Sequence, residues 1–164
     1  MKKSFILLGL TLLSYTHTVN AQSLFDTVYK SAIEKVNDVK SSQETIDINQ
    51  FEVTALNYLQ TQVKKRALKK DSYFYDSQAV NLKSFVDDFL YYLNKTRTMP
   101  QAKRAAVIAC YREASLSNPL FNDTNKERIY CYVNDTKTYT PFSLDTDWDK
   151  AYNQATAKIK TIIK

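Results

Sequence analysis

Glycine and histidine are almost absent from this 164-residue chain. Gly9 is the one glycine and His17 the one histidine, and both lie within the first 21 residues. Without histidine beyond that point, the chain lacks the Ser-His-Asp and Cys-His catalytic arrangements and the usual zinc ligands. Without glycine, it also lacks phosphate-cradling loops and the dinucleotide-binding fingerprint. We therefore predict no metal site and no cofactor.

The first 21 residues have the order of a secretory signal peptide. Two lysines at positions 2 and 3 precede an apolar run at 5–13, and the segment ends in Val19-Asn20-Ala21. The apolar run is much shorter than the roughly 20 residues that a membrane-spanning helix needs. We expect cleavage after Ala21, a periplasmic or extracellular location and no membrane span.

The rest of the chain, residues 22–164, is expected to form a single domain. The sequence is 44% hydrophobic and 24% charged, a balance typical of water-soluble globular proteins. Removal of Lys2 and Lys3 would lower the formal net charge from +6 to +4. Because this excess is small and dispersed, it does not indicate a nucleic-acid partner.

Cys110 and Cys131 are the only cysteines in the chain. An even number of cysteines in an exported protein favours a disulfide, so we predict that these two residues are paired. Closing a loop of about 20 residues would contribute about 3 kcal/mol to stability. The alternative is a pair of buried free thiols.

Apolar residues recur at spacings of three and four in several segments, which predicts an all-α fold. The first helix is expected over 24–40, followed by a polar loop at 41–45 and a second helix capped by Asn49. Ser77 would cap the third helix, and Pro100 would lie in the first turn of the fourth. The run at 105–111 is apolar on every side, so this fourth helix is expected at the centre of the fold.

Two more helices are expected in the C-terminal part. Thr124 and Glu127 have the spacing of a capping box, which predicts a short helix over 126–134. Residues 129–133 are also rich in strand-forming types, so a β-strand remains an alternative there. The last helix is expected to start near Thr146, with Trp148 at the head of its buried stripe. Six short amphipathic helices would form one compact bundle or stacked-hairpin domain.

Acidic residues alternate at Asp145, Asp147 and Asp149, as in the opening of a calcium loop. The glycine and glutamate that such a loop needs further on are replaced by Lys150 and Thr156. We therefore interpret these aspartates as residues that stabilise the start of a helix.

A basic and aromatic cluster is the candidate binding surface. The basic part runs from Lys64 to Lys70 and three aromatic residues follow it; the candidate binding residues are Lys65, Lys69, Tyr73, Phe74 and Tyr75. Flat aromatic faces beside cations can contact a polyanion or stack on a sugar. The other interpretation is a lysine-rich helix end next to core aromatics. The chain also has 12 tyrosines, more than a core of this size needs, which favours a contact surface.

One part of the chain resembles a known group of proteins. The stretch Ala-Ser-Leu-Ser-Asn-Pro-Leu-Phe-Asn-Asp at 114–123 is continued by Phe-Ser-Leu-Asp-Thr-Asp-Trp at 142–148. Together they resemble a recurrent C-terminal signature of small secreted bacterial helical proteins of unknown function. The resemblance implies an exported bacterial domain and identifies neither a catalytic residue nor a ligand.

These observations favour an exported helical module that binds a protein or a glycan and has no catalytic residues. One alternative is a small glycan hydrolase, because two carboxylates suffice for glycoside hydrolysis. Its acids would be Asp87, Asp88 and Glu113, although the nearby cations Lys83 and Arg112 oppose the raised pKa that a general acid needs. The other alternative is a structural accessory subunit.

Overall fold

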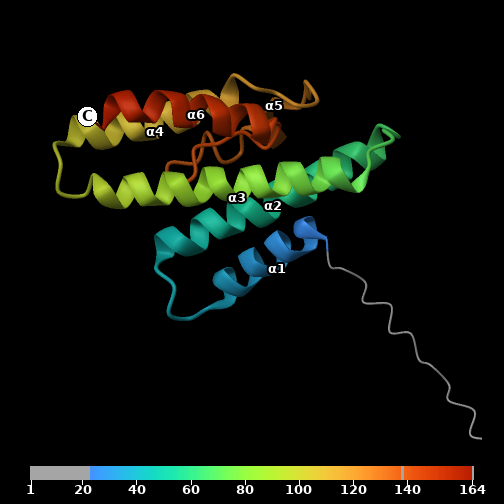
Figure 1. Cartoon of the computed structure of the whole chain (residues 1–164), viewed down its shortest axis with the longest axis horizontal. Helices are drawn as coiled ribbons and strands as arrows, with labels where there is room; N and C mark the ends of the chain where they lie inside the picture. Colours follow the sequence, from blue (N-terminus) through green and yellow to red (C-terminus); the bar gives the residue numbers. More distant parts are fainter. Residues whose placement is uncertain (1–22, 138, 164) are drawn as a thin grey trace, which may run out of the picture.

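The computed structural model describes residues 23–137 and 139–163, which form six helices and no strand (Figure 1). The all-α prediction is confirmed. The predicted signal peptide at 1–21 lies outside the described residues. The helices are α1 (Leu24–Asn37), α2 (Gln43–Lys65), α3 (Ser72–Lys95), α4 (Gln101–Leu116), α5 (Lys126–Ile129) and α6 (Trp148–Ile162).

The helix α3 lies at the centre of the molecule. It contacts α1 and α2 on one side and α4 and α6 on the other (Figure 1). The prediction that the helix containing residues 105–111 is central was therefore wrong, because among the described helices α4 packs only against α3 and α6. Ala105 and Ala109 on its outer side are exposed. Alanine has a small side chain, so its exposure to water costs little free energy.

An aromatic cluster joins the two sides of the core. Trp148, only 1% exposed, packs edge-on against Phe51 of α2 and Phe85 of α3, with ring centroids 5.8 and 5.4 Å away. Phe142, from the connection before α6, lies 5.1 Å from the Phe85 ring and 4.9 Å from Phe89. The predicted burial of Trp148 is confirmed. Edge-to-face pairs of this kind add to the free energy gained from burial alone.

The second helix begins well before the predicted cap at Asn49. Its N-cap is Ser42, within the segment predicted to be a loop. Glu44, in the first turn, is buried and forms ion pairs with Arg97 at 2.5 Å and Arg104 at 3.4 Å. These partners lie far along the chain, so the contacts that stabilise this polar turn do not show in local periodicity.

The third helix also starts earlier than predicted. Asp71, rather than Ser77, is the N-cap of α3, and its carboxylate accepts a hydrogen bond from the Phe74 N–H at 2.9 Å. The aromatic run at 73–75 consequently lies at the start of the helix. Successive side chains on a helix point in different directions, so the three rings do not share one face.

Hydrogen bonds to the Asp145 side chain hold the connection between α4 and α6, residues 117–147, against the core. Its buried carboxylate accepts hydrogen bonds from the N–H groups of Leu120, Phe121 and Asp123 at 3.2, 2.8 and 2.7 Å. Asp147 is the N-cap of α6 and Asp149 lies in its first turn, as predicted. Asp145 instead stabilises the loop backbone.

The two stretches that carry the sequence resemblance, 114–123 and 142–148, lie against each other. Besides the contacts of Asp145, the Ser115 hydroxyl accepts a hydrogen bond from the Ser143 N–H at 2.9 Å and is 2.9 Å from the Thr146 hydroxyl. All of these groups are buried. The pairing gives this part of the sequence a structural role.

The fifth helix is shorter than predicted. α5 ends at Ile129, and its N-cap is Asn125 rather than Thr124. Residues 130–133 form turns, so the segment 129–133 is neither the longer helix nor the strand considered from sequence. No helix among the described residues is long and apolar enough to cross a membrane.

The predicted disulfide between Cys110 and Cys131 is not formed. Cys110 is buried between α4 and α6, where its thiol lies 3.9 Å from the carbonyl oxygen of Ala155. Cys131 is exposed in the turn after α5, where it lines a surface hollow together with Tyr58 of α2. The two thiols therefore face different helices, which cysteine number and compartment could not indicate.

Candidate functional site

The predicted binding surface lies where α2 ends and α3 begins, but the structure divides its residues. Lys65 is the last residue of α2 and Lys69 lies in the following loop. Tyr73 is 78% exposed, whereas Phe74 and Tyr75 are half-buried. The structure has two separate hollows in this region, whereas the sequence predicted one continuous surface.

The first hollow is shallow and contains the predicted residues Lys69 and Phe74. Lys70 and Asp71 complete its lining. The Lys70 ammonium lies 4.4 Å from the centre of the Phe74 ring, a cation–π contact. Since a cation of the protein already covers this ring, the hollow offers little free aromatic surface to a ligand.

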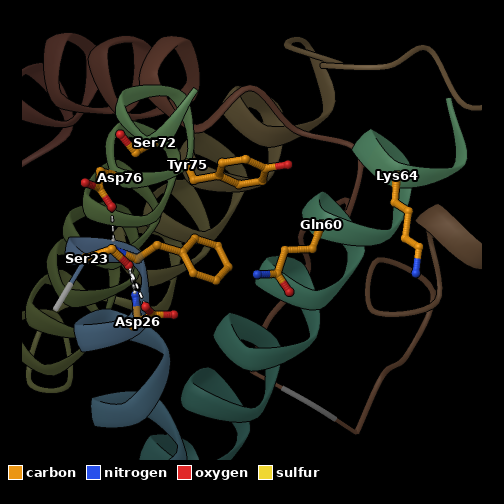
Figure 2. Close-up of a pocket in the computed structure, with 8 residues that line it drawn as sticks. Ser23, Asp26, Gln60, Lys64, Ser72, Tyr75 and Asp76 are labelled. Atoms are coloured by element: carbon orange, nitrogen blue, oxygen red, sulfur yellow. Dashed lines mark hydrogen bonds between the residues drawn. The ribbon is translucent and has the colours of Figure 1, made fainter. Parts of the chain in front are cut away.

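The second hollow is a pocket of about 420 Å³ at the same end of the bundle (Figure 2). Short loops make α2 run opposite to both α1 and α3, so the last turns of α2 meet the first turns of its two neighbours. Tyr75 is the member of the predicted surface that enters this pocket. Its lining consists of Ser23, Phe25, Asp26, Gln60, Lys64, Ser72, Tyr75 and Asp76.

We call Ser23, Asp26 and Asp76 the acidic wall of the pocket. Ser23 is the N-cap of α1; its hydroxyl accepts a hydrogen bond from the Asp26 N–H at 3.1 Å and lies 2.8 Å from the Asp26 carboxylate. Asp76 reaches across from α3 and accepts a hydrogen bond from the Phe25 N–H at 2.8 Å (Figure 2). The start of α1 therefore holds both carboxylates in place.

Two aromatic rings, Phe25 and Tyr75, form the floor of the pocket. They meet edge to face with their centroids 5.9 Å apart. Phe25 is buried and also stacks on Tyr29 at 6.3 Å. Tyr75 is only half-buried, so part of its ring remains open to the pocket.

Gln60 and Lys64 form the second wall, which belongs to α2. Gln60 points toward Asp26 across the pocket, whereas Lys64 lies one turn further along α2 and its side chain points in a different direction (Figure 2). Both residues are exposed, and neither side chain has a hydrogen-bond or ion-pair partner among residues 23–137 and 139–163. The pocket thus has acceptors on one side, donors on the other and aromatic carbon between them.

The acids considered for a hydrolase are engaged separately. Asp87 pairs with Lys83 of α3 and with Lys35 of α1, whereas Glu113 of α4 pairs with Lys158 of α6. Burial raises the pKa of Asp88, and a hydrogen bond with the Tyr152 hydroxyl opposes this effect. This rise is opposite to the effect expected from nearby cations. Asp87 and Glu113 therefore belong to different ion pairs, formed by different pairs of helices.

Sequence reasoning identified only part of the pocket. It named Tyr75 and the basic cluster that includes Lys64, but missed Ser23, Asp26, Gln60, Ser72 and Asp76. The spacing of Ser23 and Asp26 is a cap signal that could have located the start of α1. Nothing local to Gln60 or Asp76 indicates that they share a pocket with it.

Within the described part of the chain, no three His, Cys, Asp or Glu side chains gather closely enough to hold a metal ion. Comparison with known protein families, curated proteins and solved structures finds no match to this chain.

Proposed function

We propose that this protein is an exported binding module that recognises a glycan in the pocket between α1, α2 and α3. The observation that carries the proposal is the lining of that pocket. It combines a partly open tyrosine ring, carboxylate oxygens held in place by α1, and an amide and an ammonium group without partners in the described residues. Export is supported by the signal-peptide order of the first 21 residues.

Sugar units suit this lining for a chemical reason. A sugar ring has an apolar face that can stack on an aromatic ring, and its hydroxyl groups both donate and accept hydrogen bonds. The hydroxyls would donate to Asp26 and Asp76 and accept from Gln60 and Lys64, while the ring lies on Tyr75. The pocket volume of about 420 Å³ falls within the range of about 300–1,000 Å³ found for small-molecule sites. A short sugar unit would therefore fill it.

Binding can be tested by isothermal titration calorimetry with a panel of mono- and disaccharides. Tyr75→Leu removes the stacking ring but keeps an apolar side chain, and we expect it to weaken binding at least tenfold, or about 1.4 kcal/mol. Tyr73→Leu is the matched control, since Tyr73 is a highly exposed tyrosine nearby that does not line the pocket. Equal loss in both variants, or no binding of any sugar, would contradict the proposal.

The same titrations distinguish a binding module from a hydrolase. Products are expected to remain below detection after long incubation with oligosaccharides. Turnover that is lost in Asp88→Asn or Glu113→Gln, with helical content unchanged, would replace the binding proposal with the hydrolase. Export is checked separately by N-terminal sequencing of the secreted protein, which we expect to begin at Gln22.

A further inference from the structure

Three charged groups line the pocket: Asp26 and Lys64, which are exposed, and Asp76, which is half-buried. Near other helix ends, Glu44 and Asp147 have basic partners within 4 Å. In contrast, Asp26, Asp76 and Lys64 form no ion pair with any described residue. The pocket therefore holds two carboxylates on one wall and an ammonium group on the other, none of them neutralised by the protein.

Each carboxylate on the acidic wall keeps one oxygen available to a ligand. Asp76 uses Oδ1 to accept from the Phe25 N–H, and Asp26 uses Oδ2 to contact the Ser23 hydroxyl. The other oxygen of each group has no hydrogen-bond partner among the residues that the structure describes. These contacts fix the orientation of the carboxylates before a ligand arrives, which reduces the cost of binding.

An anionic ligand does not suit this wall. The first turn of a helix normally attracts anions, but Asp26 and Asp76 already supply negative charge at the start of α1. A second anion would meet both carboxylates. A cation there would instead gain charge-assisted hydrogen bonds, and the neighbouring Tyr75 ring favours positive charge near its face.

We propose that the sugar bound in this pocket is a hexosamine whose amino group is free and protonated. This inference rests on the proposed glycan-binding function and specifies its ligand class. The ammonium group lies against the acidic wall and donates to Asp26 and Asp76. The ring stacks on Tyr75, and the remaining hydroxyl groups accept from Gln60 and Lys64. The positive charge of Lys64 repels the ammonium group and so favours this single orientation.

The test compares three sugars of similar size by calorimetry: glucosamine, glucose and N-acetylglucosamine. Glucosamine carries the positive charge, and the other two are neutral. We expect glucosamine to bind at least tenfold more tightly than either neutral sugar at low salt. We also expect its preference to shrink as salt rises, because the pocket is open to solvent and its charges are screened.

Asp26→Asn provides the specific variant, because asparagine retains an oxygen that can contact Ser23. We expect it to reduce the preference for glucosamine over glucose to less than threefold, because asparagine can still accept from a sugar hydroxyl but carries no charge to attract the ammonium group. Glu34→Gln is the matched control: it removes the same charge from an exposed position on α1 that does not line the pocket. The control should retain the full preference.

The outcomes separate this inference from the proposed function. If glucose and N-acetylglucosamine bind as tightly as glucosamine, the glycan-binding function stands and the hexosamine inference is overturned. If none of the three sugars nor any member of the wider panel binds, the proposed function itself fails. A preference that is equally reduced in Asp26→Asn and Glu34→Gln would also overturn the inference, since it would show a general effect of charge.

Discussion

Glu52 is a buried acid whose environment makes stability depend on pH. It is 2% exposed on α2, and its Oε1 has no hydrogen-bond partner among the described groups. Burial raises the pKa of this carboxyl from 4.5 to about 7; Lys83 and Lys35 oppose the rise, and Asp87 adds to it. The folded protein therefore holds this proton more tightly than the unfolded chain does.

We predict that Glu52→Gln flattens the pH dependence of stability. The contribution of Glu52 is fully present below about pH 4.5 and is lost as pH rises through about 7, a change on the order of 3 kcal/mol. Urea denaturation should show that Glu52→Gln is more stable than the wild type at pH 8 and differs less between pH 5 and pH 8. Glu34→Gln serves as the control. An unchanged pH dependence in Glu52→Gln would contradict the assignment.

Unlike the buried carboxyl group of Glu52, the buried carboxylate of Asp145 accepts hydrogen bonds from several backbone N–H groups. Asp145→Ala would leave the N–H groups of Leu120, Phe121 and Asp123 without their acceptor. Hydrogen bonds to charged groups contribute about 1.5–3 kcal/mol each, so we expect a loss of at least 3 kcal/mol in the free energy of unfolding. Glu34→Ala, an exposed change, should stay within about 0.5 kcal/mol. A similar small loss for Asp145→Ala would show that the loop does not depend on this carboxylate.

At the scale of single helices, the outer position of α4 can be tested by substituting two of its alanines. Ala109 is exposed and Ala114 is fully buried on the same helix. Ala109→Lys should change the free energy of unfolding by less than about 0.5 kcal/mol, whereas Ala114→Lys should prevent stable folding because it buries a charge without a partner. Thermal unfolding followed by circular dichroism measures both. Equal damage would indicate that α4 is buried on both sides.

Helices with regular local spacing were the part of the fold that sequence could predict. α1 and α6 carry their buried residues at steps of three and four, including Phe25, Val28 and Ala32 in α1. The start of α2 could not be located this way, since Glu44 is stabilised by Arg97 of the α3–α4 connection and Arg104 of α4. The position of α4 was also unpredictable, because alanine-rich segments are compatible with both burial and exposure.

At the scale of the whole molecule, the separation of the two cysteines predicts different reactivity. Cys131 is exposed, whereas Cys110 is buried and its burial raises the pKa of its thiol. Because the thiolate is the reactive form, a maleimide should label only Cys131 in the native protein and both residues after denaturation. Peptide mapping under non-reducing conditions identifies the sites. Absence of labelling even in denaturant would instead indicate a disulfide.

The pocket is also a feature of the whole molecule, because its residues are far apart in the sequence. This explains why the sequence predicted so little of it. Its residues come from the ends of three helices and span positions 23–76. Tyr75 could be singled out because aromatic residues beside lysines form a local pattern. Asp26 and Asp76 have no such pattern, and they meet only because the α1–α2 and α2–α3 turns bring the helix ends together.

The position of Ser23 links the pocket to processing of the chain. Ser23 is part of the acidic wall, and in the sequence it lies two residues after Ala21, the expected cleavage position. Cleavage after Ala21 would leave only Gln22 in front of it. An N-terminal affinity tag on the mature sequence would then be joined one residue away from a residue of the pocket, so a C-terminal tag suits the binding experiments.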